Sequence, residues 1–520
     1  MAAVRGAAGR EEGFMRGWGP LTAVCLSTFM LLVDVTICVV ALPDMARALH
    51  ASLSDLQWVL DGYALALAAL LLGVGAAADI LGRRRVHVAG VVVFAAASLA
   101  CGLAPGPGAL VAARAVQGAG GAAMLATTLP LLGSVYEGRD RSVALGVWGA
   151  VSGAAAAVGP VLGGVLTQGP GWRWIFLVNL PVSVAAVWMS LRVVPESRAP
   201  RGRGIDWAGT ATFALFAAAL TYGVVRAGAV GWTSAHTLSA FALAVVALGC
   251  FAVVQRRAAH PLLDPALFRR PAFLGAMVGA LAFNGAAFGV LPYTSIWLQT
   301  VLGMSPVRGG LVMVPLSVAS FVVAAVGGRL LHGVPARLTI GGGLLLVGVG
   351  GFCQAVLDAG DSWAALVPGL VLVGFGTGLV APAIAGAALA AVPQERAGMA
   401  GGAVNTFRQL GYALGVAVYG TVLTARMREA LPDAAARALA GGGARALRGE
   451  LPERVLRAAF ASGLDTAAQA AGATAVVAGA LVLVLLRSRR PGRTVRAQAA
   501  QDGQAAQDAP GAQDPAAAGF

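Results

Sequence analysis

Apolar residues in this chain form long unbroken runs that are separated by short polar turns containing Gly or Pro. Each run holds roughly 20 residues, the length that an α-helix needs to cross a bilayer. The predicted spans are 19–43, 56–78, 86–104, 109–133, 143–167, 174–194, 207–226, 235–254, 272–298, 309–331, 337–357, 363–385, 400–424 and 471–487. The pattern therefore predicts an all-α polytopic membrane protein with fourteen transmembrane helices.

Arg residues gather in alternate turns between these spans, and all 37 basic residues are Arg. Clusters follow spans two, four, six and eight: Arg83, Arg84 and Arg85; Arg139 and Arg141; Arg192, Arg198, Arg201 and Arg203; Arg256, Arg257, Arg269 and Arg270. The positive-inside rule then places both termini in the cytoplasm. A net charge of +14 could indicate a nucleic-acid partner. The placement of the Arg residues at the membrane turns argues against one.

A weak internal repeat divides the spans into two halves. Residues 118–120 in span four correspond to residues 374–376 in span twelve, and Gly75 and Asp79 correspond to Gly328 and His332. Parallel six-helix repeats are a transporter architecture. The predicted parts are a cytoplasmic N-terminus (1–17), an N-terminal six-helix bundle (18–194), a two-helix insert with linkers (195–271), a C-terminal six-helix bundle (272–487) and a disordered cytoplasmic tail (488–520).

The predicted external loop 425–470 departs from the positive-inside rule. It carries seven Arg against five acidic residues. Its apolar spacing indicates one or two short surface helices that are broken at Gly441–Gly443.

In the N-terminal half, three charged residues lie at least one helical turn inside predicted spans: Asp34, Asp61 and Arg114. Charge at this depth is costly, so function is its default interpretation. Asp34 and Arg114 lie at compatible depths, with Gln117 on the same helix face as Arg114. A carboxylate balanced between burial and a nearby Arg can load and release a proton. Asp61 lies near the outer end of its span, and simple solvation there is the alternative.

The turn between spans two and three contains Gly75, Asp79, Gly82, Arg83 and Arg84. One explanation is topology alone, since an Arg cluster holds a loop inside the cell. The fixed distances of the two Gly residues from Asp79 indicate a role beyond topology. We expect Asp79 to be held against a neighbouring helix end and Arg partners.

Span five contains a stretch of small residues, 149–164. Gly149, Gly153, Ala157, Pro160 and Gly164 follow 3- and 4-residue steps, so they share one helix face. Such a face lets another helix approach closely, and Pro160 bends the helix. The alternatives are ordinary tight packing and a hinge that seals a transport path.

Together these motifs resemble the major facilitator superfamily, in particular its fourteen-helix drug/proton antiporter branch. The similarity covers roughly residues 18–490. It rests on residues 32–43 of the first span, 75–85 of the turn, 114–120 of the fourth span, 159–164 of the fifth (Gly159, Pro160, Gly163 and Gly164), 172–181 and 405–411. The resemblance implies two six-helix bundles plus two inserted helices, a gating role for the turn, a proton-relay role for Arg114 and an antiporter role for the fifth helix.

The sequence departs from the family pattern at four positions. Val39 replaces a usual Asn, Ile80 replaces a usual Arg, His332 stands for the second-half Asp, and Leu370 stands where Arg114 repeats. The second half should therefore take less part in proton handling.

The second-half spans contain no acidic residue away from their ends, which favours a neutral or singly charged substrate. Their main polar groups are Arg408 and Asn405; with Gln117 and Asn284 these are candidate cavity-lining residues.

No metal or nucleotide chemistry is predicted. The five Cys are scattered, mostly within apolar runs, and the five His lie in or beside predicted loops. No Walker-type Gly-Lys-Ser/Thr is present. We therefore expect no cofactor and no enzyme activity.

The resemblance implies efflux of amphipathic small molecules such as drugs or antibiotics across the bacterial cytoplasmic membrane. Export would proceed in exchange for protons, by alternating access, with the protein functional as a monomer. A dedicated exporter of one natural product is the alternative within the same class. A membrane-embedded transferase is the alternative from another class, but the clustered acids or His that it needs at a membrane face are missing from the sequence.

Overall fold

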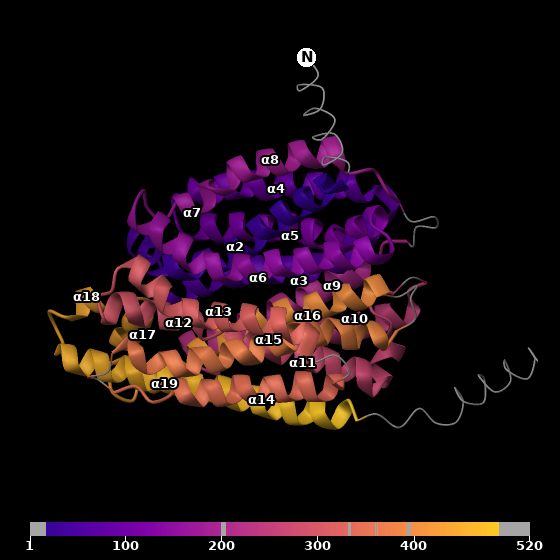
Figure 1. The fold of residues 1–520 in the computed structure, drawn as a ribbon. Helices are drawn as coiled ribbons and strands as arrows, with labels where there is room; N and C mark the ends of the chain where they lie inside the picture. The colour runs from indigo at the N-terminus through magenta and orange to yellow at the C-terminus, as the bar shows by residue number, and fades with distance from the viewer. Residues whose placement is uncertain are drawn as a thin grey trace, which may run out of the picture.

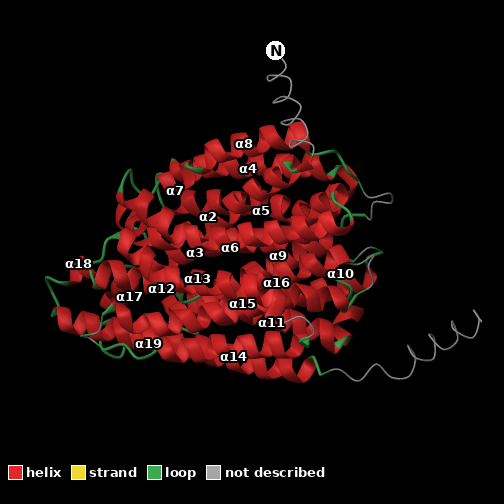
Figure 2. Ribbon diagram, in the orientation of Figure 1, coloured by secondary structure: helices red, strands yellow, loops and turns green. Residues whose placement is uncertain are grey.

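The computed structural model describes residues 17–198, 204–259, 261–330, 334–358, 360, 362–392 and 397–487. The predicted tail 488–520 and nearly all of the N-terminal segment 1–17 lie outside these residues, as does His332. Within the described part, fourteen helices are long and apolar enough to cross a membrane. This confirms the predicted fold class, and Figure 2 shows helices joined by loops, without strands among the described residues.

Two groups of helices lie one above the other in Figure 1. The N-terminal half consists of α2 (Gly19–Leu49), α3 (Leu53–Leu81), α4 (Arg83–Gly102), α5 (Pro107–Val135), α6 (Gly138–Gln168), α7 (Trp174–Leu177) and α8 (Asn179–Val193). The insert consists of α9 (Trp207–Val230) and α10 (Ala235–Arg257), followed by the short η1 (Pro265–Arg269).

The C-terminal half begins with α11 (Pro271–Phe288) and ends with α19 (Glu453–Leu485). Between them lie α12 (Leu291–Ile296), the π-helical turn η2 (Trp297–Val301), α13 (Pro306–Leu330), α14 (Ala336–Gln354), η3 (Trp363–Leu366), α15 (Val367–Ala390), α16 (Ala397–Met427), α17 (Asp433–Ala440) and α18 (Ala444–Leu447). We call the end of the molecule that carries α17 and α18 the α17 face, and the opposite end, with the turn at Arg83, the Arg83 face (Figure 1).

The two halves repeat the same glycine contacts. A Cβ at Gly120 of α5 would lie 2.8 Å from the carbonyl oxygen of Gly90 on α4, and Gly118 meets the backbone of Tyr63 on α3. In the second half, Gly376 and Gly374 of α15 meet the backbones of α14 and α13 in the same way. Such close backbone approach needs residues without a side chain. These contacts agree with the repeat at 118–120 and 374–376, while Gly328 lies where side chains are not described.

Two seams join the halves. In one, α3 packs against α16, where Thr406 donates to the carbonyl oxygen of Ala68 (3.2 Å). In the other, α6 packs against α13. The insert is not a separate unit, because α9 packs on both α3 and α16 while α10 packs on α9. Val245 and Val246 of α10 are 70% and 61% exposed, as expected of a lipid-facing surface.

Span nine is interrupted rather than continuous. Helix α11 ends at Phe288 and α12 begins at Leu291. Pro292 has no N–H to continue the ladder, and Gly289 packs on the backbone of Gly415, 2.8 Å from an added Cβ. The break lets η2 turn Gln299 toward α2, where its amide donates to the carbonyl oxygen of Val40 (2.8 Å).

The start of span fourteen is predicted wrongly. The helix begins at Glu453 rather than 471, because buried residues such as Phe460 and Gly463 alternate with charged ones on an amphipathic extension. The loop before it is correspondingly shorter and contains α17 and α18, which confirms two short helices with a break at Gly441–Gly443. The longer helix also contains Asp465, so the statement that the second-half spans hold no internal acid is wrong.

Candidate functional site

Asp34 lies at the centre of a buried polar cluster in the N-terminal half. Its Oδ2 accepts from Nη1 of Arg114 at 2.5 Å. Its Oδ1 accepts from Nε2 of Gln117 at 2.8 Å and Nδ2 of Asn179 at 2.9 Å. Gln117 and Asn179 also donate to the hydroxyl of Ser98, at 2.8 and 3.3 Å. Helices α2, α4, α5 and α8 therefore meet through one carboxylate.

Arg114 is held from several sides. Its Nε donates to the carbonyl oxygen of Val59 (3.1 Å), and its Nη1 also donates to Oε1 of Gln117 (2.6 Å). The guanidinium lies 4.2 Å from the centre of the Tyr63 ring and 5.7 Å from that of Phe176. Aromatic faces stabilise a desolvated cation. Arg114 therefore faces other protein side chains and not lipid.

The ion pair between Asp34 and Arg114 is fully enclosed, with side chains 0% and 1% exposed. Taking two charges out of water costs several kcal/mol each unless geometry and further hydrogen bonds compensate. Here Gln117 and Asn179 supply those bonds to the carboxylate. The arrangement is sensitive to protonation because every donor to Asp34 is oriented toward a negative charge.

Asp61 lies on a different surface, at the seam between α3 and α16. It is 0% exposed, and neither carboxyl oxygen has a hydrogen-bond partner among the described residues. The alternative of simple solvation is therefore excluded in this state. Tyr293 and Tyr412 of the C-terminal half lie within electrostatic range of its carboxyl group.

One helical turn closer to the α17 face, Gln57 bridges the same seam. Its amide donates to the hydroxyl of Tyr293 (2.9 Å), and that hydroxyl donates to the carbonyl oxygen of Val416 (2.5 Å). These contacts separate Asp61 from the α17 face. Asp61 and the Asp34 cluster are not joined by a hydrogen bond within the described part of the chain.

The turn at the Arg83 face is a compact charge cluster. Gly82 has φ +115°, which an L side chain adopts with strain. Asp79 pairs with Arg83 at 2.9 Å. Arg83 is the first residue of α4, so this ion pair joins Asp79 to the end of the neighbouring helix. Gly75 is less confined, since an added Cβ would lie 3.7 Å from the methyl group of Ala126.

Glu196, just after α8, completes this turn. Its Oε1 accepts from the backbone N–H of Arg84 at 3.0 Å, and its Oε2 lies 3.9 and 3.7 Å from the Nε atoms of Arg84 and Arg85. The Arg83 N–H donates to the carbonyl oxygen of Ser197 (2.9 Å). Sequence reasoning missed Glu196, although it is an isolated acid within an Arg-rich turn.

The small residues of α6 face two neighbours instead of one. An added Cβ at Gly153 would lie 2.9 Å from the Phe321 ring of α13, and at Gly164 2.6 Å from the Cα of Val307. Gly159 meets Thr36 of α2, and Gly163 lies 2.9 Å from the carbonyl oxygen of Ile37 there.

Other small residues of α6 complete this picture. The carbonyl oxygen of Pro160 meets Gly310 on α13. Gly149, predicted to share the close face, has nothing within 4 Å of an added Cβ. Helix α6 is thus clamped between the two halves.

Comparison with known proteins gives the family. The profile described as Major Facilitator Superfamily matches residues 24–416, more than half of the chain. The chain belongs to the major facilitator superfamily. It is therefore a membrane transporter and not an enzyme, which excludes the membrane-embedded transferase.

The chain is similar to bacterial proteins that are named for drug or antibiotic resistance. The chain is 36% identical over 422 residues to "Multidrug resistance protein Stp" of Mycobacterium tuberculosis (strain CDC 1551 / Oshkosh), which covers 79% of this chain and 78% of that protein. It is 34% identical over 495 residues to "Tetracenomycin C resistance and export protein" of Streptomyces glaucescens, covering 90% and 91%. Among solved structures, a bacterial homologue of the human lysosomal transporter Spinster, in an inward-facing and occupied conformation, has a TM-score of 0.63 at 17% identity and covers 90% and 96%. This last similarity concerns the fold alone.

The candidate cavity-lining residues of this superfamily member have separate surroundings. Gln117 belongs to the Asp34 cluster. Asn284 accepts from Nε of Arg408 at 3.3 Å, and that guanidinium lies 5.4 Å from the Phe283 ring. Asn405 donates to its own helix, to the carbonyl oxygen of Gly401. Arg408 is thus a half-buried cation, with an amide rather than an acid as its partner.

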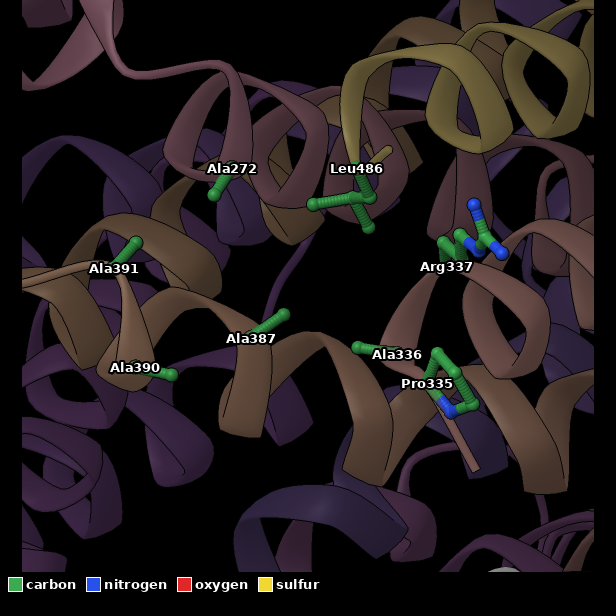
Figure 3. Close-up of a pocket in the computed structure, with 8 residues that line it drawn as sticks. All are labelled: Ala272, Pro335, Ala336, Arg337, Ala387, Ala390, Ala391 and Leu486. Carbon is green, nitrogen blue, oxygen red and sulfur yellow. The ribbon is translucent and has the colours of Figure 1, made fainter. Parts of the chain in front are cut away.

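A small cavity of about 270 Å³ opens at the Arg83 face of the C-terminal half (Figure 3). It is lined by Ala272, Pro335, Ala336, Arg337, Ala387, Ala390, Ala391 and Leu486. Arg337 is the one charged side chain among these eight. None of the predicted site residues lines this cavity, so it has no part in the proposals below.

Two buried polar residues of the N-terminal half, His87 and Asn179, were not identified from the sequence. His87 is fully buried and lies 3.1 Å from the Ser27 hydroxyl and 2.9 Å from the Thr127 hydroxyl, so the prediction that every His lies at a loop is wrong. The turn before α4 is a single residue, which places His87 one turn inside the helix. Asn179 could have been found as an isolated amide in an apolar span. The described residues contain no group of three or more His, Cys, Asp or Glu that could hold a metal.

Proposed function

We propose that this protein exports amphipathic small molecules, such as drugs or antibiotics, across the bacterial cytoplasmic membrane in exchange for protons. The observation that carries the proposal is the fully buried Asp34–Arg114 pair, in which one titratable carboxylate connects four helices. Export as the direction of transport is supported by the names of the multidrug and antibiotic exporters to which the chain is similar.

The proposed coupling step is protonation of Asp34. A proton on this carboxyl group removes the negative charge that pairs with Arg114. The guanidinium still has two acceptors on its own half, Oε1 of Gln117 and the carbonyl oxygen of Val59. Arg114 can therefore stay in place while α2 is released from α5. Protonation of Asp34 would in this way change how the two helices pack.

Asp61 is the proposed second proton carrier. It lies without a partner at the seam between α3 and α16. An ionised carboxylate there adds an unpaired buried charge to the seam, whereas a protonated one does not. Protonation of Asp61 would therefore alter the free energy of closing the two halves against each other.

Alternating access is proposed to occur by rocking of the halves about the two seams. At the α17 face, α2 and η2 are joined by the Gln299–Val40 hydrogen bond, which holds that side closed. The clamp of α6 between α2 and α13 would keep protons and substrate from leaking past during the movement.

The proposed orientation places the Arg83 face in the cytoplasm, together with both termini, because Arg residues gather there. The protein would act as a monomer and without a cofactor, driven by the proton gradient. One charge moved through about 100 mV supplies roughly 2.3 kcal/mol, equivalent to about a fifty-fold substrate gradient.

Dedicated export of one natural product is the second candidate function. Its support is the similarity over 90% of the chain to an exporter named for tetracenomycin C. The two candidate functions differ in the number of compounds that the protein would export. Expression in a bacterial host without its own major pumps should raise resistance to several unrelated amphipathic compounds if efflux is general, and to one compound if it is dedicated. No change with any compound, although the protein reaches the membrane, would contradict both.

A further inference from the structure

A large cavity lies under α17 and α18, between the N- and C-terminal halves. Its volume is about 970 Å³, and it is lined by residues of α2, α3, α9, η2, α16, α17 and α18. Ligand sites in proteins typically have volumes of about 300–1,000 Å³. The cavity is therefore large enough for a drug-sized molecule.

All charged side chains that line this cavity are basic. Arg47, Arg226, Arg437 and Arg445 line it, together with His50. Neither Asp nor Glu is among the described residues that line it. A cavity lined by cations alone attracts anions and repels cations.

Two of these cations have acidic partners outside the lining. Arg47 pairs with Asp44, one turn earlier on α2. Arg437 lies 3.8 Å from Asp433, which Arg428 contacts more closely, at 3.3 Å. The negative charge around the cavity is thus already shared among Arg residues.

The other two cations are not balanced. Arg226 has no ion-pair partner among the described residues, and its Nε is buried without an acceptor. Its guanidinium carbon lies 5.9 Å from the centre of the Tyr222 ring. Arg445 has Asp44 within electrostatic range, but Asp44 is already paired with Arg47. Because Arg presents a planar set of N–H donors that fits carboxylates, these two side chains provide the polar contacts of an anion site.

The remaining walls suit an amphipathic ligand. Leu53, Val225 and Met304 provide apolar surface, and Ser52 and Thr424 provide hydroxyl groups. The floor is Gln57, whose hydrogen bond to Tyr293 separates the cavity from Asp61. The cavity is therefore a site of its own and not part of either carboxyl site.

Helices α17 and α18 form the roof and are fixed to the bundle. The Nη2 of Arg448 donates to the carbonyl oxygens of Thr300 and Val301 of η2, at 3.4 and 3.3 Å. A Cβ at Gly441 would lie 3.1 Å from the backbone nitrogen of Leu53. This segment departs from the positive-inside rule, and two of its Arg residues, Arg437 and Arg445, line the cavity.

We propose that this cavity is an exit site for amphipathic anions, in which Arg226 and Arg445 bind a carboxylate, sulfonate or phenolate group of the molecule being exported. The inference rests on the proposed export function and adds the substrate class: anions with an aromatic or aliphatic body. The unusual Arg content of the 425–470 segment then serves substrate binding rather than topology.

The test uses the purified full-length protein and two dyes, anionic carboxyfluorescein and cationic ethidium. Binding is measured by fluorescence anisotropy for wild type, Arg226→Gln/Arg445→Gln and Arg226→Lys/Arg445→Lys. The Gln variant should bind carboxyfluorescein about tenfold more weakly, and the Lys variant should recover part of the affinity because the charge remains. The matched control is Arg454→Gln, an exposed Arg of α19 outside the cavity, which should bind like wild type. Equal affinities for wild type and the Gln variant would overturn the proposal, as would an equal loss in the control.

The same proteins are reconstituted into vesicles to separate this inference from the proposed function. Under an imposed pH gradient, the ratio of carboxyfluorescein to ethidium transport should fall about tenfold in the Gln variant. Absence of gradient-driven transport of either dye by wild type would contradict the proposed function but leave the binding result standing. Transport with an unchanged ratio would contradict the exit site alone. Loss of carboxyfluorescein binding when phosphatidylglycerol is added to neutral vesicles would assign the cavity to lipid headgroups and overturn the proposal.

Discussion

At the scale of single residues, two buried carboxyl groups differ in their surroundings. Asp34 accepts hydrogen bonds from three side chains and pairs with Arg114. Asp61 accepts none among the described residues. The first site is assembled around a negative charge, and the second provides nothing to stabilise one. Substitutions at the two sites should therefore have opposite effects on stability.

Arg114→Gln removes the cation that pairs with Asp34. A buried charge left without its partner typically costs about 3–5 kcal/mol. We expect a clearly lower melting temperature for the purified variant at neutral pH. Arg408→Gln is the control, because the half-buried Arg408 has an amide, Asn284, as its partner and its removal leaves no charge unpaired. Equal losses in the two variants would show that Arg114 does not stabilise the fold through Asp34.

Asp61→Asn replaces a carboxyl group that has no hydrogen-bond partner by a neutral group of the same shape. The melting temperature should stay at the wild-type value or rise, since no contact is lost. Substrate-driven proton movement in vesicles should nevertheless fall, because the titratable group at the seam is gone. A large loss of stability with normal proton movement would mean that Asp61 is structural.

At the scale of elements, α6 is the helix whose sequence and packing agree most closely. Its small residues approach α2 at Gly159 and Gly163, and α13 at Gly153 and Gly164. A single small face was predicted from the 3- and 4-residue spacing. In the structure, Gly153, Pro160 and Gly164 of that face all meet α13, whereas Gly149 has no neighbour within 4 Å. Gly159 and Gly163 lie outside the predicted face and meet α2 instead, so α6 is narrow on two sides.

Gly159→Leu should disrupt the contact between α6 and α2. Overpacking costs about 1–3 kcal/mol, which moves a two-state equilibrium by roughly five- to a hundred-fold. The variant should insert into the membrane but lose coupled export, and Gly159→Ala should lose less. Gly149→Leu is the control on the same helix, since it meets open space. If Gly159→Leu and Gly149→Leu transport equally well, α6 is ordinary packing.

The turn at the Arg83 face depends on two acids. Asp79→Ala or Glu196→Gln should slow exchange between the two states more than it weakens substrate binding, because each releases an Arg from the turn. Dye binding and dye transport are measured on the same preparation. Glu137→Gln, an exposed acid that begins α6, should change neither. Loss confined to binding would show that the turn has another role.

At the scale of the whole molecule, hydropathy determines most of what could be predicted. Fourteen apolar runs predict fourteen spans, because a bilayer requires helices of one length. Hydropathy could not predict where α19 begins. One face of its first turns packs on protein, and the opposite face carries charged residues. Breaks within spans, as at Gly289, depend on tertiary contacts that hydropathy does not report.

The candidate site could be predicted in part. A charge inside a span indicates Asp34, Asp61 and Arg114 without any structure. A neutral partner such as Ser98 gives no comparable signal, because a hydroxyl group in a span is common. The large cavity under α17 and α18 was not predicted either, since it combines residues from seven elements that are far apart in the sequence.

The central claim is that Asp34 couples proton movement to export. Inverted membrane vesicles containing the protein are acidified inside, and the collapse of the pH gradient on adding carboxyfluorescein is recorded for wild type, Asp34→Asn and Asp34→Glu. We predict collapse with wild type, none with Asp34→Asn at equal protein levels, and a partial response with Asp34→Glu, which keeps a titratable group. Wild-type collapse with Asp34→Asn would contradict the account.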